Sequence, residues 1–184
     1  MTTPNEVLLE VSERVAVITL NAPERMNTIS GPMLDDVSAR LLDADRDRDV
    51  RCIILTGAGR AFCAGLDLAA QMSGPKGSLG NLGSLDSNPG EFDIREAPPV
   101  VLHNIDTPTI CALNGGAAGY GLDLALGADI RVMASSAKLA ASYRARTSRT
   151  RGGRWLVARS VVEARVSRFD SQPIIATPPA AGVC

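Results

Sequence analysis

The chain has 184 residues, 45% of them hydrophobic, which is enough for one domain with a buried core. Its net charge of −1 is unevenly divided: residues 1–138 sum to −7, and residues 139–184, with eight arginines and two acids, sum to +6. No apolar run approaches the ~18 residues of a membrane span, and the first six residues lack the features of a secretory signal. The four cysteines fit no metal-binding spacing, so we expect reduced thiols, no metal site and a cytoplasmic protein.

The first third of the chain predicts a hairpin, a helix and a strand. Residues 6–11 and 15–20 are rich in valine, leucine and isoleucine and are separated by the short polar run Ser12-Glu-Arg14, which is typical of a hairpin. Ser30 is expected to cap a helix, because apolar residues recur at helical spacing after it. Residues 50–56 contain the apolar run Cys52-Ile-Ile-Leu55, which indicates a buried strand. The loop that follows is expected to enter a short helix at 66–72.

The middle of the chain alternates between strands and helices. Residues 73–90 are rich in glycine, serine and proline and predict a long loop, and residues 91–104 can be helical only on either side of Pro98-Pro99. Two apolar segments, 109–113 and 130–133, predict strands that flank a glycine-rich turn and a short helix opening near Gly119. This alternation is typical of an α/β domain.

Two segments carry most of the functional information. The first runs from Leu55-Thr-Gly57 to Ala61-Phe-Cys-Ala-Gly-Leu-Asp-Leu68, and the second joins Asn114-Gly115 to Gly119-Tyr-Gly-Leu-Asp123 and Ala128-Asp-Ile-Arg131. With Pro108 and an early loop, Pro23-Glu-Arg-Met-Asn27, they resemble the crotonase superfamily, the enoyl-CoA hydratase/isomerase family, over residues 6–138. The resemblance implies a spiral of ββα units, a coenzyme A thioester as substrate, and no metal or redox cofactor.

The resemblance also implies an oxyanion site made from two main-chain N–H groups. Matching the motifs places the first on Leu66 and the second on Tyr120. Unpaired N–H groups at a helix start, with glycines that allow close approach, suit an oxygen that becomes negative during a reaction. The alternative is that both are ordinary glycine-rich turns that pack a helix on a sheet.

Asp123 matches a position where hydratases of the family carry a catalytic glutamate. A carboxylate there can orient water or move a proton, and the alternative is a charge that stabilises a helix start. The second hydratase acid would fall at Tyr143, and no acid lies between Asp129 and Glu163. We therefore expect weak hydration at most.

Five further residues match positions that hold the nucleotide part of coenzyme A in relatives. They are Arg25, Met26, Ala64, Asp67 and Leu68. Arg25 is the candidate phosphate ligand, with a solvated loop arginine as the alternative.

The basic end of the chain fits the family pattern poorly. We divide the chain into a crotonase-like acyl-CoA-binding core, residues 1–138, and a basic, atypical C-terminal remnant, residues 139–184, in which 171–184 is expected to be unstructured. The family's C-terminal helical segment is therefore expected to be incomplete, through truncation or a shifted reading frame. Relatives are trimers or pairs of trimers, an assembly that this ending puts in question. The alternatives to an enzyme are a non-catalytic remnant and, ranked below it, a nucleic-acid binder that uses the arginines.

Overall fold

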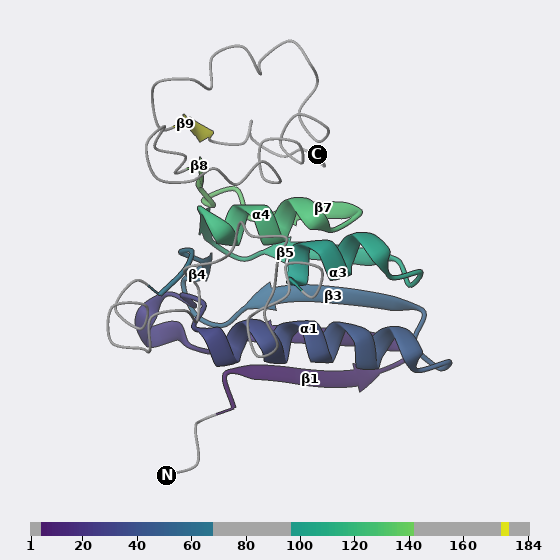
Figure 1. Ribbon diagram of the computed structural model, residues 1–184. Helices are drawn as coiled ribbons and strands as arrows, with labels where there is room; N and C mark the ends of the chain where they lie inside the picture. Colours follow the sequence, from purple (N-terminus) through teal and green to yellow (C-terminus); the bar gives the residue numbers. More distant parts are fainter. Residues whose placement is uncertain (1–4, 68–96, 142–173, 177–184) are drawn as a thin grey trace.

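A five-stranded sheet with helices packed on it forms the larger part of the described chain. The computed structural model describes residues 5–67, 97–141 and 174–176 (Figure 1). The sheet has the order β1-β2-β3-β5-β7, in which β1 is antiparallel to β2 and the other neighbours are parallel. Its strands are β1 (Val7–Ser12), β2 (Val15–Leu20), β3 (Cys52–Gly57), β5 (Thr109–Leu113) and β7 (Ile130–Met133).

The predicted hairpin is confirmed and closes through a two-residue turn. Glu13 and Arg14 have φ angles of 49° and 68°. Positive φ at both central residues is the geometry whose twist matches that of antiparallel strands. The ladder begins at Ser12 and Val15, directly beside the turn.

The long helix α1 (Gly31–Arg46) begins where the sequence predicts. The hydroxyl of Ser30 accepts a hydrogen bond from the Met33 N–H at 3.4 Å, and Pro32 lies in the first turn. Helix α1 buries Leu34, Val37 and Leu41, and it packs on β1, β2 and β3. The apolar periodicity of the sequence therefore marked its inner face correctly.

Two shorter helices complete the layer. Figure 1 shows α3 (Pro98–Asn104) between α1 and α4 (Tyr120–Gly127), and α3 contacts both of the others. The prolines were expected to interrupt a helix, but α3 begins with them. The first turn of a helix needs no N–H donor, so proline is tolerated there. The predicted helix at 66–72 and the loop at 73–90 lie largely or wholly outside the described residues.

A second, smaller sheet was missed by the sequence analysis. Its order is β4-β6-β8-β9, and its strands are β4 (Ala61–Cys63), β6 (Gly116–Ala118), β8 (Leu139–Ala141) and β9 (Ile174–Ala176). Strands of three residues are too short to show a two-residue period, and β6 lies in what was predicted to be a glycine turn. Residues 174–176 were predicted to be unstructured, and that was wrong, because they pair with β8.

The core lies between the large sheet and the helices. Alternate residues of β2, β3 and β5 point inward, and the fully buried side chains include Ile18, Ile53 and Leu55. Helix α4 also contacts β4, β6 and β8. The end of β4 is thereby placed against the start of α4, which is where the two candidate oxyanion turns fall.

Candidate active site

The two glycine-rich turns lie in direct contact. Gly65 has a φ of +110°, and a Cβ added to it would lie 3.1 Å from the Ala118 carbonyl oxygen and 3.8 Å from the Tyr120 nitrogen. A side chain at position 65 would thus enter the space between the two turns. Glycine is needed here both for its backbone angle and for the close approach.

The N–H of Leu66 is directed away from the nearest backbone segment. The Gly65 carbonyl accepts a hydrogen bond from Ile29 N–H at 2.8 Å, and Asp67 N–H donates to the Ile29 carbonyl at 2.9 Å. In a trans peptide the C=O and N–H groups point in opposite directions, and the described chain has no cis bond. The Leu66 N–H therefore points away from Ile29, and it has no acceptor among the described residues.

The N–H of Tyr120 has no acceptor among the described residues for a related reason. Tyr120 is the first residue of α4, and the Gly119 carbonyl accepts from the N–H groups of Leu122 and Asp123 at 2.9 and 3.2 Å. The Tyr120 N–H, in the same peptide unit, points out of the helix start. Gly119 has φ 52° and ψ −122°, a conformation that favours glycine. Within the described ranges, neither predicted donor has a protein acceptor.

Cys63 fills the space between β4 and α4. It is fully buried, and a Cβ added to Gly121 would lie 2.8 Å from its Sγ atom. Burial raises the pKa of the Cys63 thiol to about 11. The thiol therefore stays neutral at ordinary pH, and its place in the fold is that of a packing residue.

Asn27 holds the first loop against the turn between β3 and β4, a role that the sequence analysis missed. Its side-chain oxygen accepts from Ala22 N–H at 2.8 Å. Its amide nitrogen lies within hydrogen-bond distance of three carbonyls, those of Ala58, Ala61 and Phe62, at 2.9, 2.9 and 3.1 Å. Asn27 is fully buried and has a φ of 54°. An asparagine after Arg25-Met26 was the available signal, since asparagine tolerates this conformation.

Four of the five residues expected to bind coenzyme A come together. Ala64 N–H donates to the Met26 carbonyl at 3.0 Å, and Arg25 lies 3.8 Å from the Asp67 carboxylate. Leu68 lies outside the described residues. Arg25 also pairs with Glu6 at 2.8 Å, so its charge is balanced within the protein. This pairing gives Arg25 a structural contact within the protein, and its role as a phosphate ligand stays a prediction.

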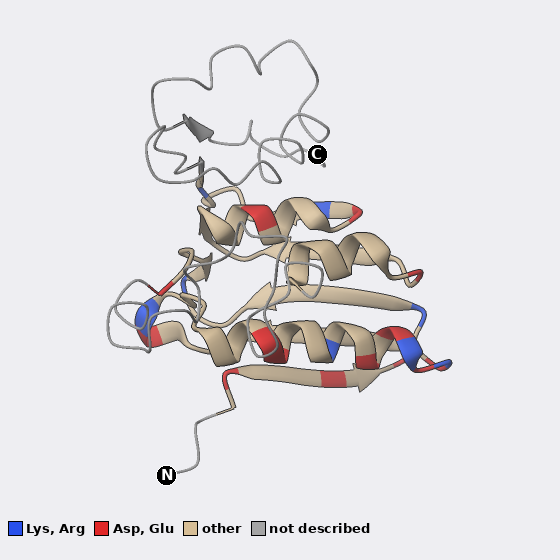
Figure 2. Ribbon diagram, viewed as in Figure 1, with Lys and Arg blue, Asp and Glu red and all other residues tan. Residues whose placement is uncertain are grey.

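Asp123 is the acid of α4, and it lies in the first turn. Figure 2 shows α4 with an acidic segment in red. Tyr120 and Asp123 are three residues apart and so share one face of the helix. Burial raises the pKa of the Tyr120 phenol, and the charge of Asp123 raises it further. Tyr143, the position of the second hydratase acid, lies outside the described residues.

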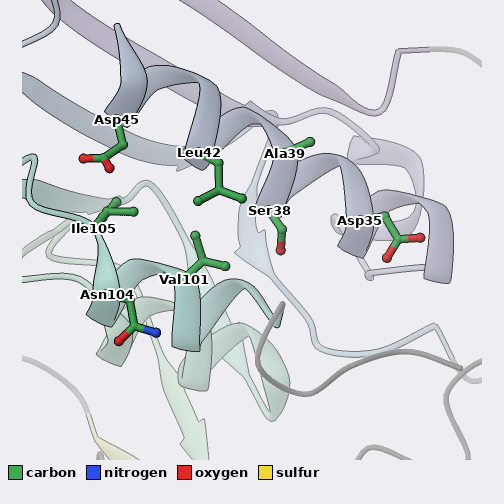
Figure 3. Close-up of a pocket in the computed structure, with 8 residues that line it drawn as sticks. All are labelled: Asp35, Ser38, Ala39, Leu42, Asp45, Val101, Asn104 and Ile105. Atoms are coloured by element: carbon green, nitrogen blue, oxygen red, sulfur yellow. The ribbon is translucent and has the colours of Figure 1, made fainter. Parts of the chain in front are cut away.

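A separate groove of about 440 Å³ lies between α1 and α3. Figure 3 shows Asp35 and Asp45 at its edges and apolar side chains such as Leu42 and Val101 between them. It shares no residue with the two turns. Its carboxylates would repel the phosphates of coenzyme A, so the groove is a poor candidate for the nucleotide.

The comparison with protein families decides the identity of this arrangement. The enoyl-CoA hydratase/isomerase family model matches residues 10–169. The chain belongs to the enoyl-CoA hydratase/isomerase family. The crotonase resemblance is thereby confirmed, and the described fold is the mixed α/β architecture with parallel strands that this family shows.

Relatives within the enoyl-CoA hydratase/isomerase family include both isomerases and hydratases. The chain is 39% identical over 162 residues to a 1,2-epoxyphenylacetyl-CoA isomerase of Escherichia coli, which covers 86% of this chain and 59% of that protein. It is 34% identical over 128 residues to an enoyl-CoA hydratase of Alternaria alternata, and this match covers 70% of this chain and 40% of that protein. The chain thus spans 40% to 59% of the length of these two relatives.

Solved structures of the same family match most of the chain. A crystal structure of an enoyl-CoA hydratase from Bacillus anthracis has a TM-score of 0.76 at 27% identity and covers 93% of this chain and 65% of that one. A monofunctional enoyl-CoA isomerase from M. smegmatis has a TM-score of 0.68 at 31% identity, and the match covers 94% of this chain and 71% of that one. Among the described residues, no helix is long and apolar enough to cross a bilayer, and no cluster of side chains is suited to a metal ion.

Proposed function

We propose that the chain binds an acyl-CoA thioester with its carbonyl oxygen between the N–H groups of Leu66 and Tyr120. The observation that carries this proposal is the contact between the two turns, with both N–H groups directed away from protein acceptors. Negative charge that develops on a thioester oxygen is stabilised by such fixed donors. Removal of one donor of this kind typically costs about 2.7–4 kcal/mol of transition-state stabilisation.

We propose further that the reaction moves a proton on the acyl group, with Asp123 as the base. The carboxylate takes a proton from an acyl carbon, and the electron pair of that C–H bond moves to the thioester oxygen. The same group then returns the proton at another carbon. Hydration needs a second acid, which the sequence lacks between Asp129 and Glu163. Isomerisation is therefore favoured over hydration, and both activities occur in the names of the relatives.

Binding and activity are tested separately. Calorimetry with crotonyl-CoA is expected to show binding, and an absence of heat at millimolar ligand with soluble protein would exclude the acyl-CoA site. Loss of enoyl absorbance is expected to be slow, below the ordinary enzyme range of ~1–10³ s⁻¹. Hydration within that range would show that another group replaces the second acid.

Asp123→Asn removes the base and preserves the shape of the side chain. We expect it to abolish any isomerisation of a 3-enoyl-CoA and to leave crotonyl-CoA binding within about threefold. Asp43→Asn is the matched control, because Asp43 is an exposed carboxylate on α1 with no place in the proposed site. An unchanged rate for Asp123→Asn would remove this residue from the mechanism.

A further inference from the structure

The hydroxyl of Tyr120 is buried and has no hydrogen-bond partner within the part of the chain that the structure describes. Buried tyrosine hydroxyls are normally hydrogen-bonded, because an unpaired one loses its water without compensation. The aromatic ring packs against the core beside it. The ring therefore has a structural explanation, whereas the polar end of the side chain has none.

The hydroxyl belongs to a residue of the proposed thioester site. The N–H of the same residue is one of the two proposed oxyanion donors, and Asp123 shares its face of α4. The negative charge of Asp123 acts on the phenol, and a thiolate at Cys63 would do the same. A thioester whose oxygen is held at the Tyr120 N–H would thus place the nearby acyl carbons beside this helix face.

The protonation state of the phenol decides what it can do there. Burial, and secondly the charge of Asp123, raise its pKa above the usual range. The hydroxyl is therefore neutral at every ordinary pH and poorly suited to give up its proton. A neutral hydroxyl donates one hydrogen bond and accepts others, which suits it to hold an uncharged oxygen.

We propose that the Tyr120 hydroxyl determines specificity by donating a hydrogen bond to an oxygen atom that the acyl group carries near the thioester. The site then prefers acyl-CoA thioesters with a hydroxyl or keto oxygen over unsubstituted ones. This inference rests on the proposed acyl-CoA function and assigns to the side chain of Tyr120 a task separate from that of its N–H. No bond is made or broken by the phenol in this role.

The test compares two ligands that differ by one oxygen atom, butyryl-CoA and 3-hydroxybutyryl-CoA, on the wild-type chain and on Tyr120→Phe. The variant retains the ring and the main-chain donor. We expect it to weaken 3-hydroxybutyryl-CoA binding about tenfold, in the range of one lost hydrogen bond. Butyryl-CoA should bind within twofold of wild type. The melting temperature of the variant should be equal or higher, because the lost hydroxyl has no protein partner.

The other outcomes separate this inference from the proposed function. Equal weakening of both ligands, or no change in either, would overturn the role of the hydroxyl and leave acyl-CoA binding intact. A lower melting temperature would show that the hydroxyl has a protein partner, which also overturns it. If the wild-type chain binds neither thioester, the acyl-CoA proposal fails and this inference fails with it.

Discussion

At the scale of single residues, backbone conformation builds the candidate site more than side-chain chemistry does. Gly65 and Gly119 have positive φ angles, and each precedes a residue whose N–H is a proposed donor. A Cβ on Gly65 would press on the Ala118 carbonyl at 3.1 Å. The motifs predicted these glycines through the family resemblance, but the direction of each N–H depends on hydrogen bonds to Ile29 and within α4, which the sequence does not display.

Asn27 offers the sharpest stability prediction at this scale. Asn27→Ala removes a fully buried side chain and leaves the Ala22 N–H and several carbonyls without their partner. Unsatisfied buried groups cost about 1–3 kcal/mol, so we expect a loss of about 3 kcal/mol in the free energy of unfolding. Asn21→Ala is the control, because Asn21 makes an exposed hydrogen bond to Asn5, and it should cost less than about 0.5 kcal/mol. Urea denaturation measures both variants. Equal losses in the free energy of unfolding would contradict the role of Asn27 in holding the first loop.

The buried thiols predict a fall in stability at alkaline pH. Burial raises the pKa of Cys63 to about 11 and that of Cys111 to about 12, from 9.0. The folded state keeps these protons to a higher pH than the unfolded chain does. The contribution of the thiols to the free energy of unfolding is therefore complete below pH 9, and it is lost as the pH rises. At pH 10 each thiol should lower the free energy of unfolding by about 1.4 kcal/mol relative to its value below pH 9.

Denaturation at pH 8 and pH 10 measures this fall in stability. Cys63→Ala should reduce the difference between the two pH values by about 1.4 kcal/mol, whatever its effect at pH 8. If the free energy of unfolding changes between pH 8 and pH 10 by the same amount in the variant as in the wild type, this thiol titrates normally in the folded protein.

At the scale of elements, the long helix and the longer strands were predicted well from the sequence, and the three-residue strands were not. Helix α1 and strands β2, β5 and β7 follow from period and caps in the sequence. The strands β4 and β6 contain three residues each, so their existence depends on pairing partners far along the chain. The same holds for the contact of Cys63 with Gly121, which arises only when β4 and α4 meet.

The motif Ala128-Asp-Ile-Arg131 gains a physical explanation at this scale. Asp129 accepts hydrogen bonds from the N–H and hydroxyl of Thr109, both at 2.8 Å, which ties the start of β7 to the start of β5. Arg131 donates to the Ala128 carbonyl at 2.6 Å, just beyond the end of α4. A cation at this end also matches the helix dipole. The motif therefore fixes the helix that carries Tyr120 and Asp123.

Ser30→Ala tests the predicted cap of α1. The hydroxyl accepts from Met33 N–H, and loss of such a cap costs typically about 1 kcal/mol. We expect a lower midpoint in thermal unfolding and an unchanged far-ultraviolet spectrum at 20 °C. Ser12→Ala, at an exposed strand end, serves as the control. A cap variant as stable as this control would contradict the assignment.

At the scale of the whole molecule, the described chain leaves one edge of the large sheet apolar. Strand β7 is the last strand in the order, and Ile130 and Val132 are 47% and 50% exposed. An exposed apolar edge favours association with other chains. The trimeric assembly of relatives and the split into residues 1–138 and 139–184 stay predictions, since most of the second segment lies outside the described residues.

Val132→Lys should therefore reduce self-association. The side chain is half exposed, so the change should alter the free energy of unfolding by less than about 0.5 kcal/mol. Light scattering at increasing concentration is expected to show a smaller apparent mass than for the wild type. The control is Ala39→Lys, which adds the same charge at an exposed site on α1 and not on an edge strand. Equal effects of the two lysines would attribute the change to charge alone.

The central claim is that the N–H groups of Leu66 and Tyr120 hold a thioester oxygen. The most direct measurement is the absorbance difference spectrum of a bound enoyl thioester, because polarisation of its carbonyl shifts the band to longer wavelength. We expect this shift in the wild-type chain and in Gly31→Ala, whose added Cβ has open space. Gly65→Ala, which crowds the Ala118 carbonyl beside Tyr120, should lose the shift. A bound thioester with an unshifted band in the wild type, or an equal shift in Gly65→Ala, would contradict the account.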